Sequence, residues 1–126
     1  MRAVAIAIAF AGLTLQGLAQ QQPPPAVNLV QGRPETPGVT RTTLKDDEKS
    51  TVIRVRFAPG ALEPPHTHPY DVILVPVLSS PVDAAIGETK LTSLKPGEVQ
   101  FVPKGVVHHV GNKGTQPFEL IAIALK

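Results

Sequence analysis

Hydrophobic and polar residues alternate along most of the chain after residue 38, in short runs separated by glycine, proline and asparagine. In the run STVIRVRF, Ile53, Val55 and Phe57 fall on one face of an extended chain and two arginines on the other. A spacing of two is typical of a half-buried β-strand, and no stretch after residue 19 has the spacing of an amphipathic helix. The pattern therefore predicts strands and no helix in this part of the chain.

About eight strands are predicted. They cover residues 39–44, 50–57, 70–78, 82–86, 89–94, 98–102, 106–110 and 117–125. Turn-forming pairs such as Pro59-Gly60 and Pro96-Gly97 separate them. Many short strands with regular turns indicate an all-β sandwich or barrel. Pro76 inside a strand pattern predicts an edge or a bulge, because proline has no N–H for a neighbouring strand.

The first 19 residues have a different pattern. Arg2 precedes an apolar run from Ala3 to Leu15, and Gly17-Leu18-Ala19 ends it with small residues at the first and third positions. These features predict a secretory signal peptide, with an uncleaved anchor or a buried helix as the alternative. The run is shorter than the roughly 20 apolar residues that a membrane span needs. We therefore expect a periplasmic or secreted protein that has no membrane association after cleavage.

The composition of the chain after residue 19 limits the structures and functions that are possible. Residues 20–37 are rich in proline and glutamine and are predicted to form an extended arm, which leaves residues 38–126 as the barrel domain. The 12 lysines and arginines nearly balance the 10 acidic residues and form no basic block, which argues against nucleic-acid binding. The chain has no cysteine, so an exported protein of this sequence must be stabilised by its core without disulfides.

All four histidines fall in two clusters, HTH at residues 66–68 and His108-His109. Residues i and i+2 of a strand point to the same face, so His66 and His68 point together, whereas only one of the adjacent pair can face the interior. Three converging imidazoles suit a divalent transition metal, provided that they are neutral. Exposed polar residues at the start of a strand are the alternative interpretation.

The residues around these histidines resemble the two motifs of the cupins. The second motif is matched at every spacing by Gly97, Pro103, Gly105, His108 and Asn112, and the first begins here with Gly60, His66 and His68. The chain is similar to a small single-domain exported bacterial cupin of type 2. The resemblance implies an antiparallel jelly-roll barrel with His66, His68 and His108 facing a central cavity, and a homodimer.

The sequence departs from the cupin pattern at the acidic position of the first motif. Where the family has a glutamate after the second histidine, this chain has Val72 or Ile73. Strand alternation turns Val72 inward and Asp71 outward. If Pro69 shifts the register by one residue, Asp71 could instead be a fourth ligand.

Three further residues are candidates for lining the cavity: Tyr70, Val72 and Gln100. Tyr70 could equally lie at the rim or at an interface. Because the three histidines are neutral, a bound ion would keep its full charge, which favours an anionic substrate or a bound hydroxide. The metal could be Fe, Mn, Ni, Cu, Co or Zn, and no other cofactor is predicted.

Three functions remain open from the sequence. The first is a metalloenzyme, dioxygenase-like or isomerase- or hydrolase-like, acting on a small organic acid. The second is a non-catalytic protein that binds a metal or a small metabolite in the periplasm, and the third is a metal-free structural barrel. No catalytic residue is assigned, and fold alone does not choose among them.

Overall fold

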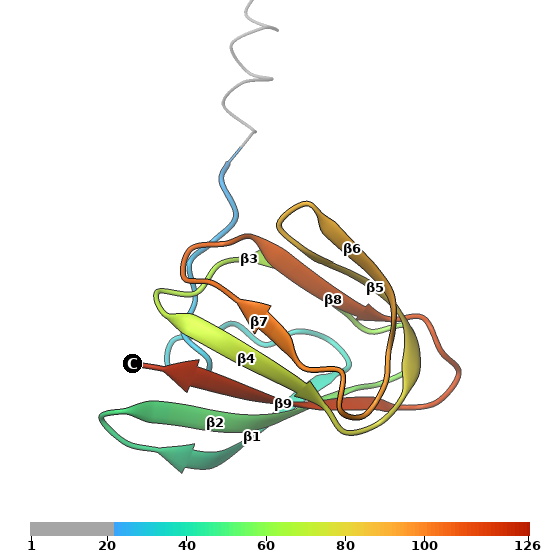
Figure 1. Cartoon of the computed structure of the whole chain (residues 1–126), viewed down its shortest axis with the longest axis horizontal. Helices are drawn as coiled ribbons and strands as arrows, with labels where there is room; N and C mark the ends of the chain where they lie inside the picture. Colours follow the sequence, from blue (N-terminus) through green and yellow to red (C-terminus); the bar gives the residue numbers. More distant parts are fainter. Residues whose placement is uncertain (1–21) are drawn as a thin grey trace, which may run out of the picture.

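The computed structural model describes residues 22–126, which form nine β-strands in two antiparallel sheets (Figure 1). The predicted signal peptide, residues 1–19, lies outside the described residues. Within the described range, no helix is long and apolar enough to cross a membrane. The predicted all-β jelly-roll barrel is confirmed.

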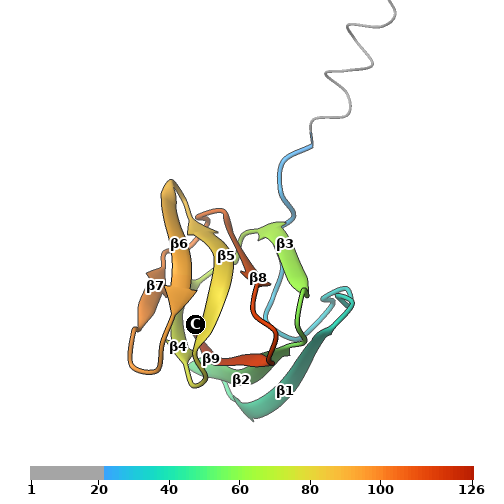
Figure 2. The same ribbon diagram turned by 90° about the vertical axis from the view of Figure 1, so that its right-hand side faces the viewer.

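The two sheets face each other across a shared interior (Figure 2). The five-stranded sheet has the order β1 (Val39–Asp46), β2 (Ser50–Phe57), β9 (Phe118–Leu125), β4 (Asp71–Pro76) and β7 (Gln100–Val102). The four-stranded sheet has the order β3 (Leu62–His66), β8 (His108–Asn112), β5 (Ser80–Ile86) and β6 (Thr89–Leu94). Strands distant in sequence are therefore neighbours, and β3 lies beside β8.

All eight predicted strands are present with small differences at their ends, and one further strand, β3, was not predicted. Its sequence, LEPPH, contains two prolines, and its pairing with β8 is irregular between Glu63 and His66. The predicted edge at Pro76 is found only locally, because β4 lies between β9 and β7 in the sheet and Pro76 is its last residue. Pro76 pairs with β9 on one side. On the other side, β7 pairs with β4 only as far as Leu74, so no strand there needs the N–H that proline lacks.

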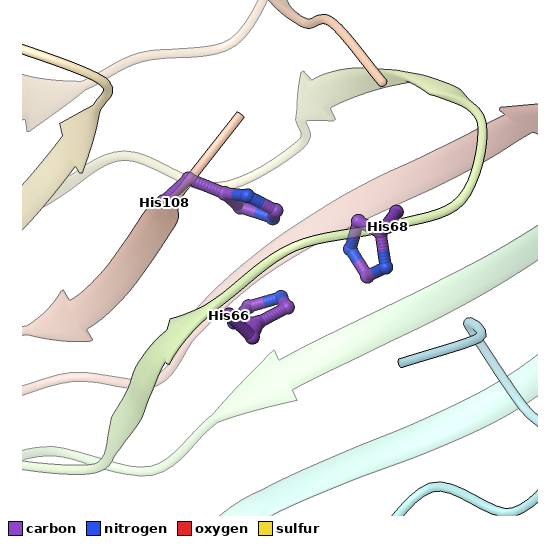
Figure 3. Close-up of side chains that lie close together, drawn as sticks. All are labelled: His66, His68 and His108. Atoms are coloured by element: carbon purple, nitrogen blue, oxygen red, sulfur yellow. The ribbon is translucent and has the colours of Figure 1, made fainter. Parts of the chain in front are cut away.

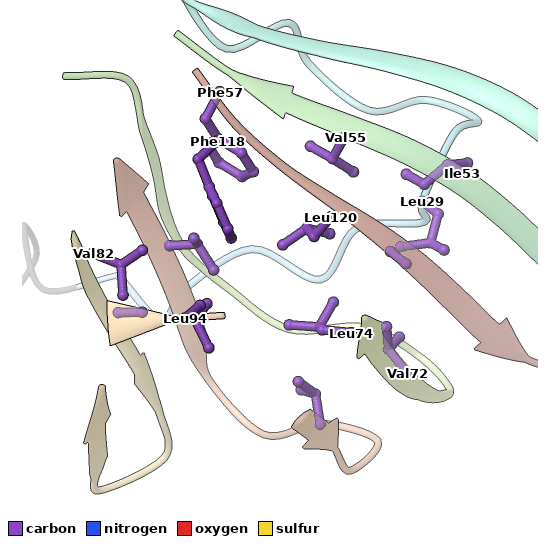
Figure 4. Packing of buried hydrophobic residues seen from close by; sticks show 14 of the residues in the cluster. Leu29, Ile53, Val55, Phe57, Val72, Leu74, Val82, Leu94, Phe118 and Leu120 are labelled. Atoms are coloured by element: carbon purple, nitrogen blue, oxygen red, sulfur yellow. The ribbon is translucent and has the colours of Figure 1, made fainter. Parts of the chain in front are cut away.

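The core lies between the sheets and follows from the alternation. Ile53, Val55 and Phe57 of β2 are buried, as predicted, and pack with residues of β9 such as Phe118 and Leu120 (Figure 4). The rings of Phe57 and Phe118 lie 5.7 Å apart, centroid to centroid. Burial of these side chains is the main favourable term that holds the two sheets together.

The arm of residues 22–37 packs on the barrel and runs beside the turn after β3 (Figures 1 and 2). Ala26 forms a parallel bridge with Thr67, where the N–H of Val27 donates to the Thr67 oxygen (2.9 Å). Leu29, 2% exposed, belongs to the core, and its N–H donates to the Tyr70 hydroxyl (2.8 Å). The arm is therefore a structural part of the barrel.

Leu29→Ala is expected to lower the free energy of unfolding by about 2–4 kcal/mol, because it leaves a cavity where the arm enters the core. The neighbouring Val30 is 40% exposed and is the matched control. Val30→Ala should change the free energy of unfolding by no more than about 0.5 kcal/mol. Urea unfolding of both variants measures the difference. Equal effects would show that the arm is not anchored through Leu29.

Candidate metal centre

Two neighbouring strands bring three histidines together inside the barrel. His66 ends β3, His68 follows two residues later, and His108 begins β8 directly opposite His66. All three are buried, at 6%, 4% and 3% exposure, and their rings point toward one another (Figure 3). Their potential ligand nitrogens all lie within 4.8 Å of one another. The structure therefore contains a three-histidine group that could hold a metal ion.

Each ring is oriented by a backbone carbonyl. The Nδ1–H groups donate to the oxygens of Pro64 (2.8 Å, from His66), Val27 (2.6 Å, from His68) and Val106 (3.0 Å, from His108). Because a carbonyl can only accept, Nδ1 carries the proton, and the neutral ring keeps its lone pair on Nε2. Orientation of this kind is typical of metal-ligating histidines. Three buried Nε2 lone pairs are a donor set that fits a divalent transition metal.

Burial keeps these imidazoles neutral. Desolvation is the main cause that lowers the pKa of His66 from 6.5 to about 3 and that of His68 to about 4, and nearby positive groups lower both further. The pKa of His108 is lowered by the same desolvation. The metal-binding protonation state is therefore present well below neutral pH.

A buried charge cluster, consisting of Arg33, Arg41 and Glu63, lies beside His66. One Glu63 oxygen, Oε1, contacts Nη2 of Arg33, and the other accepts a hydrogen bond from Nη2 of Arg41 (3.1 Å). The His66 Nε2 is 3.3 Å from Nη2 of Arg33 and 3.2 Å from Oε1 of Glu63. The Nη2 of Arg33 therefore has two acceptors within reach, the Oε1 of Glu63 and the Nε2 of His66.

Sequence reasoning missed this cluster. Glu63 precedes the histidines, whereas the cupin pattern puts its glutamate after them. Arg33 comes from the predicted extended arm, in which no functional residue was predicted. One signal was available, because Glu63 lies between Gly60 and His66 within the first motif. A charged residue there, in a segment that leads into the cavity, is a candidate for an inward-facing group.

The cavity enclosed by these groups is small. Its volume is about 30 Å³, and its lining combines the three histidines and the charge cluster with apolar residues of both sheets such as Ile53, Leu74 and Leu120. A buried water needs about 10–15 Å³ measured in this way. With the arm in this position, the cavity has room for an ion or one or two waters, but not for an organic molecule.

Asp71 lies apart from the three-histidine group. Its Oδ1 accepts a hydrogen bond from the backbone N–H of Lys104 (2.8 Å), and its strand alternates as predicted, with Asp71 only partly buried and Val72 buried. The register shift that would have made Asp71 a fourth ligand is not present in β4. The structure instead puts Glu63 nearest to the group.

The residues predicted to line the cavity lie around it instead. Val72 is fully buried in the packed core, and the Nε2 of Gln100 donates to the backbone oxygen of Glu98. Tyr70 stacks on His68, with ring centroids 6.0 Å apart, and holds the arm through its hydroxyl. None of these three borders the cavity in the described structure.

Comparison with known proteins identifies the family. The family model described as "Cupin domain" matches residues 53–124 of this chain. The chain belongs to the cupin family. This match extends from β2 to β9 and includes all three histidines of the candidate metal centre, so the motif resemblance is confirmed.

Plant proteins and bacterial structures are similar to this cupin. A germin-like protein of Arabidopsis thaliana, subfamily 2 member 1, is 45% identical over 73 residues, which are 55% of this chain and 33% of that protein. The rhicadhesin receptor of Pisum sativum is 37% identical over 76 residues, 57% of this chain and 35% of the receptor. The cupin thus spans about a third of the length of these curated relatives.

Among solved structures, a cupin domain from Bordetella pertussis Tohama I is 30% identical, with a TM-score of 0.63. That match covers 75% of this chain and 99% of the other. KdgF from Halomonas sp. has the same TM-score at 20% identity, over 75% of this chain and 84% of KdgF, and shows a shared fold.

The metal-free cupin is expected to lose stability as pH falls from about 6.5 toward about 3. The unfolded chain takes up protons at its histidines near pH 6.5, whereas folded His66 and His68 resist protonation until about pH 3 and about pH 4. Urea unfolding with chelator at about pH 7.5 and about pH 5 measures the loss. His68→Gln should make the dependence shallower, and an unchanged dependence would contradict the assignment.

Proposed function

We propose that this cupin is an exported protein that binds a divalent transition metal through His66, His68 and His108 and acts on a small organic acid. Three Nε2 lone pairs converging beside two buried guanidinium groups are the observation that carries the proposal. Export to the periplasm or the exterior is proposed from the N-terminal segment of the sequence.

The charge of the site favours an anionic substrate. Arg33 and Arg41 share one carboxylate, Glu63, so the cluster carries one surplus positive charge, to which a divalent ion would add two. Burial lowers the pKa of Arg33 to about 10, which leaves its guanidinium charged at neutral pH. Within residues 22–126, the buried Nε of Arg41 has no hydrogen-bond partner and is therefore a donor available to an acceptor.

A metal bound here would supply Lewis acidity and open coordination positions. The protein's own residues supply the rest. Arg33 and Arg41 supply positive charge that attracts an anion, the apolar walls of both sheets limit the access of bulk water, and Glu63 holds the two guanidinium groups in place beside His66.

Non-catalytic binding is the second candidate function. The small volume of the cavity, about 30 Å³, favours this function, because it has room for an ion but little space for a reacting molecule. Metal held without an exchangeable water would support this function over catalysis.

His108→Ala is expected to weaken metal binding at least about 100-fold, because losing even an outer partner of a metal ligand costs about 10–100-fold. The matched control is His109→Ala. His109 is adjacent, but its Nε2 contacts Asp83 (3.3 Å) on the other face of β8, so metal binding should be kept. Elemental analysis of protein purified without chelator or affinity tag, followed by titration, measures both.

Equal metal content in His108→Ala and the wild type would exclude this ligand set. Iron, manganese or copper in the wild type would favour redox chemistry, and zinc or nickel would favour a Lewis-acid or binding role. Failure of the wild type to bind any of these ions would leave a metal-free barrel.

A further inference from the structure

A second, larger hollow lies on the outer side of the charge cluster. This groove, of about 340 Å³, lies between the arm and β3 and shares Arg33, Glu63 and His66 with the inner cavity. Figure 2 shows the arm descending beside β3. The three shared residues border both spaces. The volume is within the range of about 300–1,000 Å³ that is usual for small-molecule sites. The groove is therefore large enough for the organic ligand that the cavity cannot hold.

The walls of the groove are apolar, and its inner end is formed by the buried charge cluster, of which Arg33 and Glu63 belong to the lining. Five prolines line it: Pro25, Pro34, Pro37, Pro64 and Pro65. Leu62, 47% exposed, lies along the same wall. Arg33 is the one cation among the lining residues. Of the two carboxylates in the lining, Glu63 is also paired with Arg41, and Glu35 would repel a second carboxylate on the ligand. The complementary molecule has one carboxylate and an apolar body.

We propose that this groove binds an organic monocarboxylate with an apolar body, and that Arg33 pairs with its carboxylate. The inference deepens the proposed function and rests on it for the reaction, although binding in the groove does not require a metal. Arg33 is suited to the role because its planar guanidinium can donate two parallel hydrogen bonds to a carboxylate.

Metal binding would release Arg33 for this role. The Nε2 of His66 has one lone pair, and in this structure the nearest donor is Nη2 of Arg33, 3.3 Å away. The same lone pair cannot bind a cation and accept from Arg33. Because Glu63 also pairs with Arg41, it stays compensated when Arg33 turns to a ligand in the groove. The structure thus links a filled metal site to a more available Arg33.

The test is titration calorimetry of benzoate, benzamide and acetate into protein prepared with chelator and into protein loaded with Co(II). Benzoate is expected to bind both forms, and the Co(II) form more tightly. Benzamide lacks the charge and acetate lacks the apolar body, so both should bind more weakly. Arg33→Gln should weaken benzoate binding about 10- to 100-fold without changing that of benzamide. Arg33→Lys should recover part of the loss.

Arg54→Gln is the matched control for charge, because Arg54 pairs with Glu119 on the outer face of the five-stranded sheet. It should leave benzoate binding unchanged. Leu62→Trp provides a variant that keeps the charge cluster intact. It should fill the groove and block benzoate while Co(II) binding persists.

Three results would overturn the inference: no benzoate binding to either form, equal binding by Arg33→Gln and the wild type, or equal binding of benzoate and benzamide. Failure of Co(II) to bind would count against the proposed function instead. The metal-free titrations would then still decide whether Arg33 and the groove bind a carboxylate.

Discussion

The short parallel pairing between the arm and the turn after β3 is the contact on which the candidate site depends. Through it, the carbonyl of Val27 reaches Nδ1 of His68 at 2.6 Å, and the Val27 N–H binds Thr67 between the two motif histidines. Leu29 then enters the core, and Arg33 reaches Glu63. The arm therefore orients one histidine, adds a side chain to the core and brings a cation to the site.

Burial of charge places a second constraint on the site. Two guanidinium groups and one carboxylate lie largely out of water, and such groups are stable there only when paired. Glu63 serves both arginines, so it is indispensable to the cluster, whereas either arginine can turn to another acceptor while the other stays paired. The arrangement makes Arg33, the residue shared by the cavity and the groove, the natural partner for an external anion.

Much of the fold and the histidine group could be predicted because both follow local rules. Alternation predicts the strands, and the motif spacing predicts His66, His68 and His108. Asn112, the last residue of the second motif, stabilises its turn by accepting the N–H of Gly114 and donating to the backbone oxygen of Gln116. Strand β3 was not predicted because its sequence, LEPPH, contains two prolines, which are rare inside strands. The charge cluster could not be predicted, since Arg33, Arg41 and Glu63 are brought together only by tertiary packing.

Competition for one lone pair links the two halves of the proposed function. If a metal displaces Arg33 from His66 and thereby strengthens its pairing with a carboxylate in the groove, the carboxylate must strengthen metal binding by the same factor, because coupling between two ligands is reciprocal. The coupling requires no movement of the barrel, since Arg33 lies in the wall between the two spaces. A ligand without an anionic group cannot contribute to this coupling, because it does not stabilise the position of Arg33 away from His66. Selectivity for carboxylates and retention of metal would then both result from the competition between Arg33 and the metal for the lone pair of His66.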